Sequence, residues 1–219
     1  MNIFLESNSL QEIREAAAAG LVQGVSFSPN EFAYADPDGD QRERLEELSH
    51  EFAIPICVTI GALNGKDIYR EAKELAKISD HIVVQIPLME DALAAMFRLN
   101  AEGVGICSTL VFNGAQALLA AKAGASMVRV SMADLDAQGQ DSTETIAEIR
   151  HVLEASGMES DVMAASPQTP TQVAECVTAG ANIISLSSKV IRSLLVHPLT
   201  DRGLDRFLSD LSKRPKRHS

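Results

Sequence analysis

Residues 104–130, VGICSTLVFNGAQALLAAKAGASMVRV, contain the pattern that decides the fold of this chain. Short apolar runs at Val104–Thr109 and Met127–Val130 enclose a segment of helical period at Ala115–Lys122. Strand, helix and strand in this order are typical of parallel strands joined by a crossover helix. Gly124 closes the helix, because glycine enters the left-handed conformation at a helix end at little steric cost.

The same unit repeats along the chain. The strand candidates are Ile3–Leu5, Gly24–Phe27, Ile54–Ile60, His81–Ile86, Val104–Thr109, Met127–Val130, Asp161–Ala165 and Ile183–Leu186. The helix candidates are Leu10–Ala19, Gln41–Glu51, Asp67–Ile78, Asp91–Asn100, Ala115–Lys122, Thr143–Ala155, Pro170–Ala179 and Lys189–Leu195. Eight such units favour a closed (β/α)8 TIM barrel of the α/β class, with a doubly wound open sheet as the alternative.

We expect residues 1–219 to form a single domain. An amphipathic stretch from about Thr200 to Leu211 predicts an extra C-terminal helix, so residues 200–219 comprise this helix and a basic tail, Lys213–His218. A solvated terminus is the expected state of that tail. No linker or low-complexity tract interrupts the repeats.

Composition limits the partners and the compartment. A formal net charge of −11 argues against nucleic acid and against an anionic membrane surface. No apolar run approaches the ~20 residues that a membrane helix requires. The three cysteines are too few for a disulfide framework, and the first residues lack the features of a signal peptide. We therefore expect a cytoplasmic protein.

In such a barrel the carboxyl ends of the strands form the active face. This rule identifies a set of side chains, here called the inner ring, that is rich in hydroxyls, amides and carboxylates. Its members are Glu6, Ser26, Ser28, Thr59, Gln85, Ser108 or Thr109, Ser131, Asp134, Asp136, Ser166, Gln168 and Ser187. We expect no Lys, Arg or His in the inner ring, and only Cys107 near its edge.

Several segments resemble the small transaldolase/fructose-6-phosphate aldolase family, collinearly over nearly the whole chain. Thr109–Phe112 with the following helix is similar to the family's strand-five signature, and Asp136–Gly139 to its loop after strand six. Ala164–Ser166 resembles its strand-seven segment, and His197–Leu204 its entry into the C-terminal helix. The resemblance implies the (β/α)8 fold and a role in carbohydrate metabolism.

The family's strand-four lysine forms a Schiff base with its sugar substrate. The resemblance places Gln85, within Val83-Val84-Gln85-Ile86-Pro87, at that position. An amide cannot form an iminium, so standard aldolase or transaldolase activity is predicted to be lost.

Other positions of the family's site are also changed. Glu6 aligns with an aspartate that assists proton transfer, and Ser131 with a proton-donating tyrosine. Among the site residues carried over from the family, only Thr109 and Ser166 are unchanged. The catalytic positions carried over are Glu6, Gln85 and Thr109, and the substrate-binding positions are Ser26, Ser28, Thr59, Ser131, Asp134, Ser166 and Gln168.

Asp134 and Gln168 align with basic residues that hold a phosphate in the family. A phosphate facing Asp134 meets repulsion of about 1 kcal/mol or more in a site of reduced dielectric. The expected ligand is therefore an unphosphorylated sugar or polyol, and no cofactor is implied.

Two readings remain open for each central residue. Gln85 is either a working hydrogen-bonding group or neutral filler, with Thr59 and Thr109 as expected partners. Glu6 is either a general acid/base in a fairly apolar surround or a structural, paired carboxylate. Glu6, Asp134 and Asp136 offer oxygen ligands for a metal ion, but without a supporting histidine we expect no metal site.

Three functions follow, in order of preference. The first is a divergent lyase or isomerase with Glu6 as acid/base. The second is a non-catalytic ligand-binding or assembly protein, and the third is residual transaldolase activity through Lys66, in the expected loop after strand three.

The expected C-terminal helix is either self-packed or an intersubunit arm, through its apolar residues Leu204, Phe207, Leu208 and Leu211. The family resemblance favours the arm and implies a homo-oligomer, a pentamer or decamer.

Overall fold

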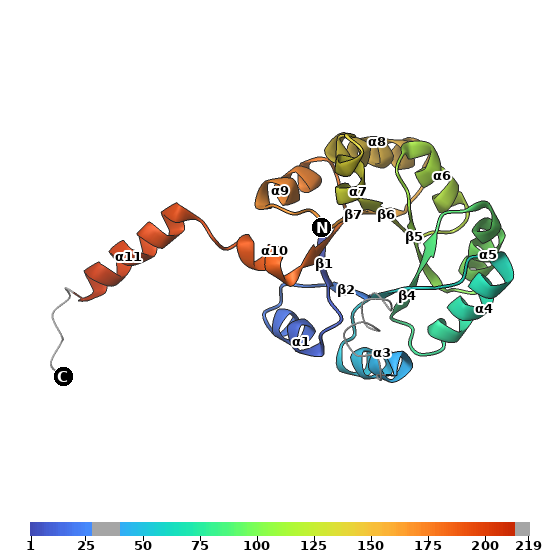
Figure 1. Cartoon of the computed structure of the whole chain (residues 1–219), viewed down its shortest axis with the longest axis horizontal. Coiled ribbons are helices and arrows are strands. Elements are labelled where there is room, and N and C mark those ends of the chain that lie inside the picture. The colour runs from blue at the N-terminus through green and yellow to red at the C-terminus, as the bar shows by residue number, and fades with distance from the viewer. Residues whose placement is uncertain (28–39, 213–219) are drawn as a thin grey trace.

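A computed structural model describes residues 1–27 and 40–212 and contains a closed barrel of eight parallel strands (Figure 1). The strands pair in chain order, and the last strand pairs with the first. They are β1 (Asn2–Glu6), β2 (Gly24–Phe27), β3 (Ile56–Thr59), β4 (Ile82–Pro87), β5 (Gly105–Thr109), β6 (Met127–Ser131), β7 (Asp161–Ala165) and β8 (Ile183–Ser187). The predicted (β/α)8 barrel is confirmed, and the open sheet is wrong.

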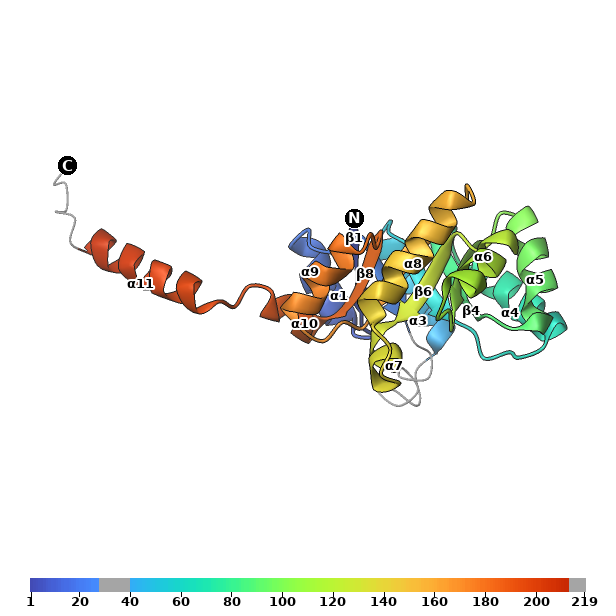
Figure 2. The ribbon, with the colours of Figure 1, turned by 90° about the horizontal axis from the view of Figure 1, so that it is seen from above.

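Helices surround the barrel on the outside (Figures 1 and 2). They are α1 (Leu10–Ala18), α3 (Gln41–Glu51), α4 (Gly65–Ala76), α5 (Glu90–Ala101), α6 (Gly114–Lys122), α7 (Met132–Ala137), α8 (Ser142–Ala155), α9 (Pro170–Thr178) and α10 (Ser188–Ser193), followed by α11 (Pro198–Ser212). Polar side chains begin many of them. For example, Asp40, Asn64 and Asp141 accept backbone N–H bonds at the starts of α3, α4 and α8.

Helix α7 is an addition to the predicted elements. The expected loop after strand six is in fact a short helix that follows β6 directly. Ser131 caps it, because its hydroxyl accepts the N–H of Asp134 at 3.4 Å. A serine followed three residues later by an acidic residue is a helix-start signal, and the resemblance to a family loop obscured it here.

The interior of the barrel is filled by side chains that alternate along the strands with outward-facing ones. Six of them form a separate inner cluster: Phe4, Cys57, Val83, Cys107, Met163 and Ile183. Space is tight: a Cβ on Gly24 would lie 2.5 Å from the Phe4 ring. A larger outer cluster joins the other strand faces to the helices.

Helix α11 projects away from the barrel in both views (Figures 1 and 2). None of its residues is buried, and Leu204, Phe207 and Leu208 are each more than half exposed. The C-terminal helix is therefore confirmed, but the self-packed arrangement is not formed. The basic tail lies outside the described residues.

No helix within residues 1–27 and 40–212 has the length and apolar character needed to cross a membrane.

Candidate functional site

An ion pair lies on the inner face of the barrel, toward the carboxyl ends of the strands. Arg129 Nη2 on β6 donates to Glu6 Oε1 at the end of β1 at 3.0 Å. The Arg129 and Glu6 side chains are only 24% and 23% exposed. Ser166, which follows β7, donates from its hydroxyl to both Glu6 oxygens at 3.2 and 3.1 Å. Three strands thus contribute to one cluster.

Arg129 corrects two expectations. The inner ring does contain a cation, and the surround of Glu6 is ionic rather than apolar. The rule that collected the ring considered only strand ends, whereas Arg129 lies two residues before the end of β6. Its long side chain spans that distance. An arginine alternating with Met127 and Ser131 in an otherwise apolar strand was the signal available in the sequence.

Ser166 is held in an unusual backbone conformation. Its φ is +58°, in the left-handed region that non-glycine residues rarely occupy. Its N–H donates to the Ser185 carbonyl at 3.0 Å, and its hydroxyl is directed to Glu6. Strain of about 1–3 kcal/mol is typical of such residues, and they cluster at functional sites.

Gln85 is buried on β4, with 3% exposure, and both ends of its carboxamide are bonded. Thr59 Oγ1 donates to Gln85 Oε1 at 3.1 Å, and Gln85 Nε2 donates to Ser26 Oγ at 3.0 Å. The expected partner Thr59 is confirmed. Ser26, rather than Thr109, takes the second end, because β2 and β3 approach Gln85 from the same side.

Two buried thiols lie next to this amide. Neither Cys57 nor Cys107 is exposed to solvent. The neighbouring Cys107 thiol and burial raise the pKa of Cys57 well above its usual value, although Gln85 and Arg129 act in the opposite direction. Cys57 is therefore protonated and unreactive at neutral pH. The inner ring holds two thiols where one was expected, and both are packing groups.

Three polar candidates lie further out. Asp134 is exposed on α7, and the Ser131 hydroxyl is used to cap that helix. Gln168 is exposed, and its side-chain amide donates to the Ser166 carbonyl at 2.9 Å. Asp136 accepts a bond from Gln172 at 3.1 Å. Within the described residues no group of three or more His, Cys, Asp or Glu side chains could hold a metal ion.

Thr109 ends β5 and is partly buried, and its carbonyl accepts the N–H of Leu88 at 2.9 Å. Lys66 is not in a loop: it is exposed in the first turn of α4, beside Tyr69 and Asp91 in a surface hollow between α4 and α5. Ser28 lies outside the described residues.

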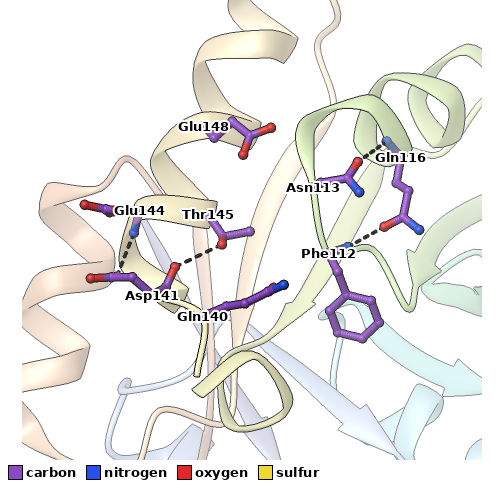
Figure 3. A pocket seen from close by; sticks show the side chains of 8 residues that line it. All are labelled: Phe112, Asn113, Gln116, Gln140, Asp141, Glu144, Thr145 and Glu148. Atoms are coloured by element: carbon purple, nitrogen blue, oxygen red, sulfur yellow. Dashed lines mark hydrogen bonds between the residues drawn. The ribbon is translucent and has the colours of Figure 1, made fainter. Parts of the chain in front are cut away.

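A separate hollow of about 620 Å³ lies between the first turns of α6 and α8 (Figure 3). Three of its polar side chains already accept backbone N–H bonds at the starts of these helices. Asn113 and Asp141 accept bonds from Gln116 N and Glu144 N, and Glu148 accepts a bond from Gly114 N. We therefore assign it a structural role.

A (β/α)8 barrel with a polar, ion-paired inner ring defines the class of this protein. The profile of the Transaldolase/Fructose-6-phosphate aldolase family matches residues 40–218. A probable transaldolase of Kosmotoga olearia is 34% identical over 96% of this chain and 95% of its own length. One of Herpetosiphon aurantiacus is 37% identical over 98% and 96%. The chain belongs to this family.

The Glu6–Arg129 pair can be tested through stability. Removing one partner, in Glu6→Gln or Arg129→Met, leaves the other without its main partner, and we expect a loss of about 1–3 kcal/mol in the free energy of unfolding. The double variant should be less destabilised than the sum of the single variants, because no charge is left unpaired. Urea denaturation of all four proteins measures this coupling; additive losses would contradict the pair.

Proposed function

We propose that this protein is an enzyme of carbohydrate metabolism that moves protons on a small, polyhydroxylated, unphosphorylated substrate without a covalent intermediate. The reaction is an isomerisation or an elimination, and Glu6 is its acid/base. The observation that carries the proposal is the position of Glu6, fixed by Arg129 and Ser166 on the inner face and still about one-quarter exposed. The described contacts orient its carboxylate without enclosing it.

The proposal departs from the name of the relatives, probable transaldolase. By the family resemblance, Gln85 occupies the position of the Schiff-base lysine, and a carboxamide nitrogen is not a nucleophile. Lys66 is exposed on α4 rather than on a strand, which argues against its replacing that lysine.

The remaining groups are suited to proton transfer. Glu6 takes a proton from a carbon next to a carbonyl, and the Arg129 guanidinium stabilises the negative charge that develops. The Ser166 hydroxyl and the hydrogen-bonded Ser26–Gln85–Thr59 chain supply donors and acceptors for substrate hydroxyls.

The charge beyond the strand ends supports an unphosphorylated substrate. Asp134 and Gln168 are both exposed, and by the family resemblance they align with the family's phosphate-binding cations. Neither attracts a dianion.

A non-catalytic, ligand-binding role is the second candidate, and one observation favours it. Both ends of the Gln85 carboxamide are already bonded within the protein, as in a residue that only holds strands together.

Borohydride trapping separates these functions. The protein is incubated with dihydroxyacetone or fructose 6-phosphate and borohydride, and its mass is measured. We expect no adduct, since Gln85 forms no iminium. An adduct that maps to Lys66 and disappears in Lys66→Ala would overturn the proposal in favour of residual transaldolase activity.

Gln85→Lys restores the family residue. We expect it to remain inactive as an aldolase, because Thr59 and Ser131 differ from the family's residues. Detectable aldolase activity in this variant would show that the rest of the family's site is still intact.

The non-covalent proposal is tested by incubating the protein with free sugars or sugar acids and following their conversion by NMR. This conversion must be lost in Glu6→Gln. If no compound is converted but one is bound, the non-catalytic candidate stands.

We further propose that the protein is a homo-oligomer in which α11 packs against a second copy of the chain. The described helix buries no residue, and Leu204, Phe207, Leu208 and Leu211 recur at the i, i+3, i+4, i+7 spacing of one apolar face. The family resemblance implies a pentamer or decamer. The three free, buried cysteines fit a reducing compartment such as the cytoplasm, the proposed location.

Light scattering coupled to size-exclusion chromatography tests the assembly. Phe207→Glu with Leu208→Lys places charges on the apolar face and should yield monomers, whereas the control Asp205→Lys should not. A wild-type monomer, or an oligomer that survives both charges, would contradict this role of α11.

A further inference from the structure

Arg129 is the only lysine or arginine on a strand within residues 1–27 and 40–212. The other lysines and arginines of this part of the chain lie on helices, except Lys77, which directly follows α4. A cation on the inner face of a barrel loses much of its hydration, so its presence requires acceptors nearby.

The acceptors among the described residues do not satisfy it. The pair with Glu6 uses Nη2, whereas Nε is buried and has no protein acceptor among the described residues. A guanidinium carries five N–H donors in a planar fork, and leaving one buried without a partner costs about 1–3 kcal/mol. The unused donor marks a place for an acceptor on a ligand.

The local charge indicates which acceptor fits. Arg129 and Glu6 together are neutral, so a ligand carboxylate leaves the site at one negative charge and a phosphate dianion leaves it at two. No second cation lies on the described strands to offset the larger charge. A planar carboxylate also matches the fork of the guanidinium, which favours two parallel N–H···O bonds.

We propose that Arg129 binds the carboxylate of a polyhydroxy acid, so that the substrate class of this site is the sugar acids. This deepens the proposed function and rests on it for the chemistry, but not for the binding. The hydroxyl chain of the acid extends toward Ser26, Thr59 and Gln85, whose polar groups line the other side of the inner ring.

The chemistry that follows is loss of water. Glu6 removes the proton from the carbon beside the carboxylate, and the electron pair of that C–H bond forms a double bond to the next carbon. The hydroxyl on that next carbon leaves and takes the proton from Glu6 as water. The enol product tautomerises to a 2-keto acid. Arg129 stabilises the charge that develops on the carboxylate, and no oxidant or reductant is consumed.

Calorimetric titration with three probes tests the assignment: D-gluconate, the neutral D-glucitol, and D-glucose 6-phosphate. We expect gluconate to bind about 10- to 100-fold more tightly than glucitol, the range of one charge-assisted contact. Arg129→Met should remove this preference, and Arg129→Lys should retain part of it.

Arg150→Met is the matched control. Arg150 is 28% exposed and also holds an ion pair, with Glu154, but it lies on α8 outside the barrel. Gluconate binding should be unchanged in this variant. If Arg129→Met fails to fold, the Glu6→Gln/Arg129→Met double variant removes both charges and serves instead.

Equal binding of gluconate and glucitol, gluconate binding that survives Arg129→Met, or tightest binding of glucose 6-phosphate would each overturn the assignment. Arg129-dependent gluconate binding without conversion would support it and leave the proposed enzyme without support. Conversion of a neutral sugar that depends on Glu6, without any preference for sugar acids, would support the proposed enzyme and overturn the assignment of Arg129.

Discussion

The closed interior of the barrel is the constraint on which the site depends. Eight strands direct side chains into one space, and the apolar cluster of Phe4, Cys57, Met163 and their neighbours fills its lower part. A charge above this layer can persist only with a partner, and Glu6 and Arg129 provide one for each other across the barrel at 3.0 Å. Ser166, held in a left-handed conformation, completes the arrangement.

This geometry connects the differences between this chain and its family at several separate positions. By the family resemblance the reactive cation belongs on strand four, where this chain has Gln85. Here the cation of the inner face is on strand six, as Arg129, and it is an arginine that cannot act as a Schiff-base amine. Gln85 instead joins Thr59 and Ser26 in a neutral hydrogen-bonded chain. The site is thus divided into a neutral half and an ion-paired half, and the proposed function uses the ion-paired half for electrostatic stabilisation and proton transfer.

The sequence predicted the fold well, because the alternation of apolar runs and helical periods is a local signal. Each predicted strand is found in the described structure, and most ends agree within one or two residues. Helix α7 was missed, although Ser131 and Asp134 formed a recognisable start.

The site was predicted less completely, because contacts across a barrel are not local. Glu6, Gln85 and Ser166 lie on the inner ring as expected, and Thr59 bonds to Gln85. Arg129 was overlooked since side-chain length, rather than position at a strand end, brings it to Glu6. Gln85 bonds to Ser26 rather than to the expected Thr109, because this contact depends on which strands approach the amide in the folded barrel.

In the proposed function, Glu6 moves a carbon-bound proton without covalent attachment of the substrate. Incubation of sugar acids and free ketoses in D2O, followed by NMR of the carbon beside the carboxyl or carbonyl group, measures that step directly. We expect deuterium incorporation or elimination with the wild-type protein and neither with Glu6→Gln. Exchange that continues undiminished in Glu6→Gln would contradict it.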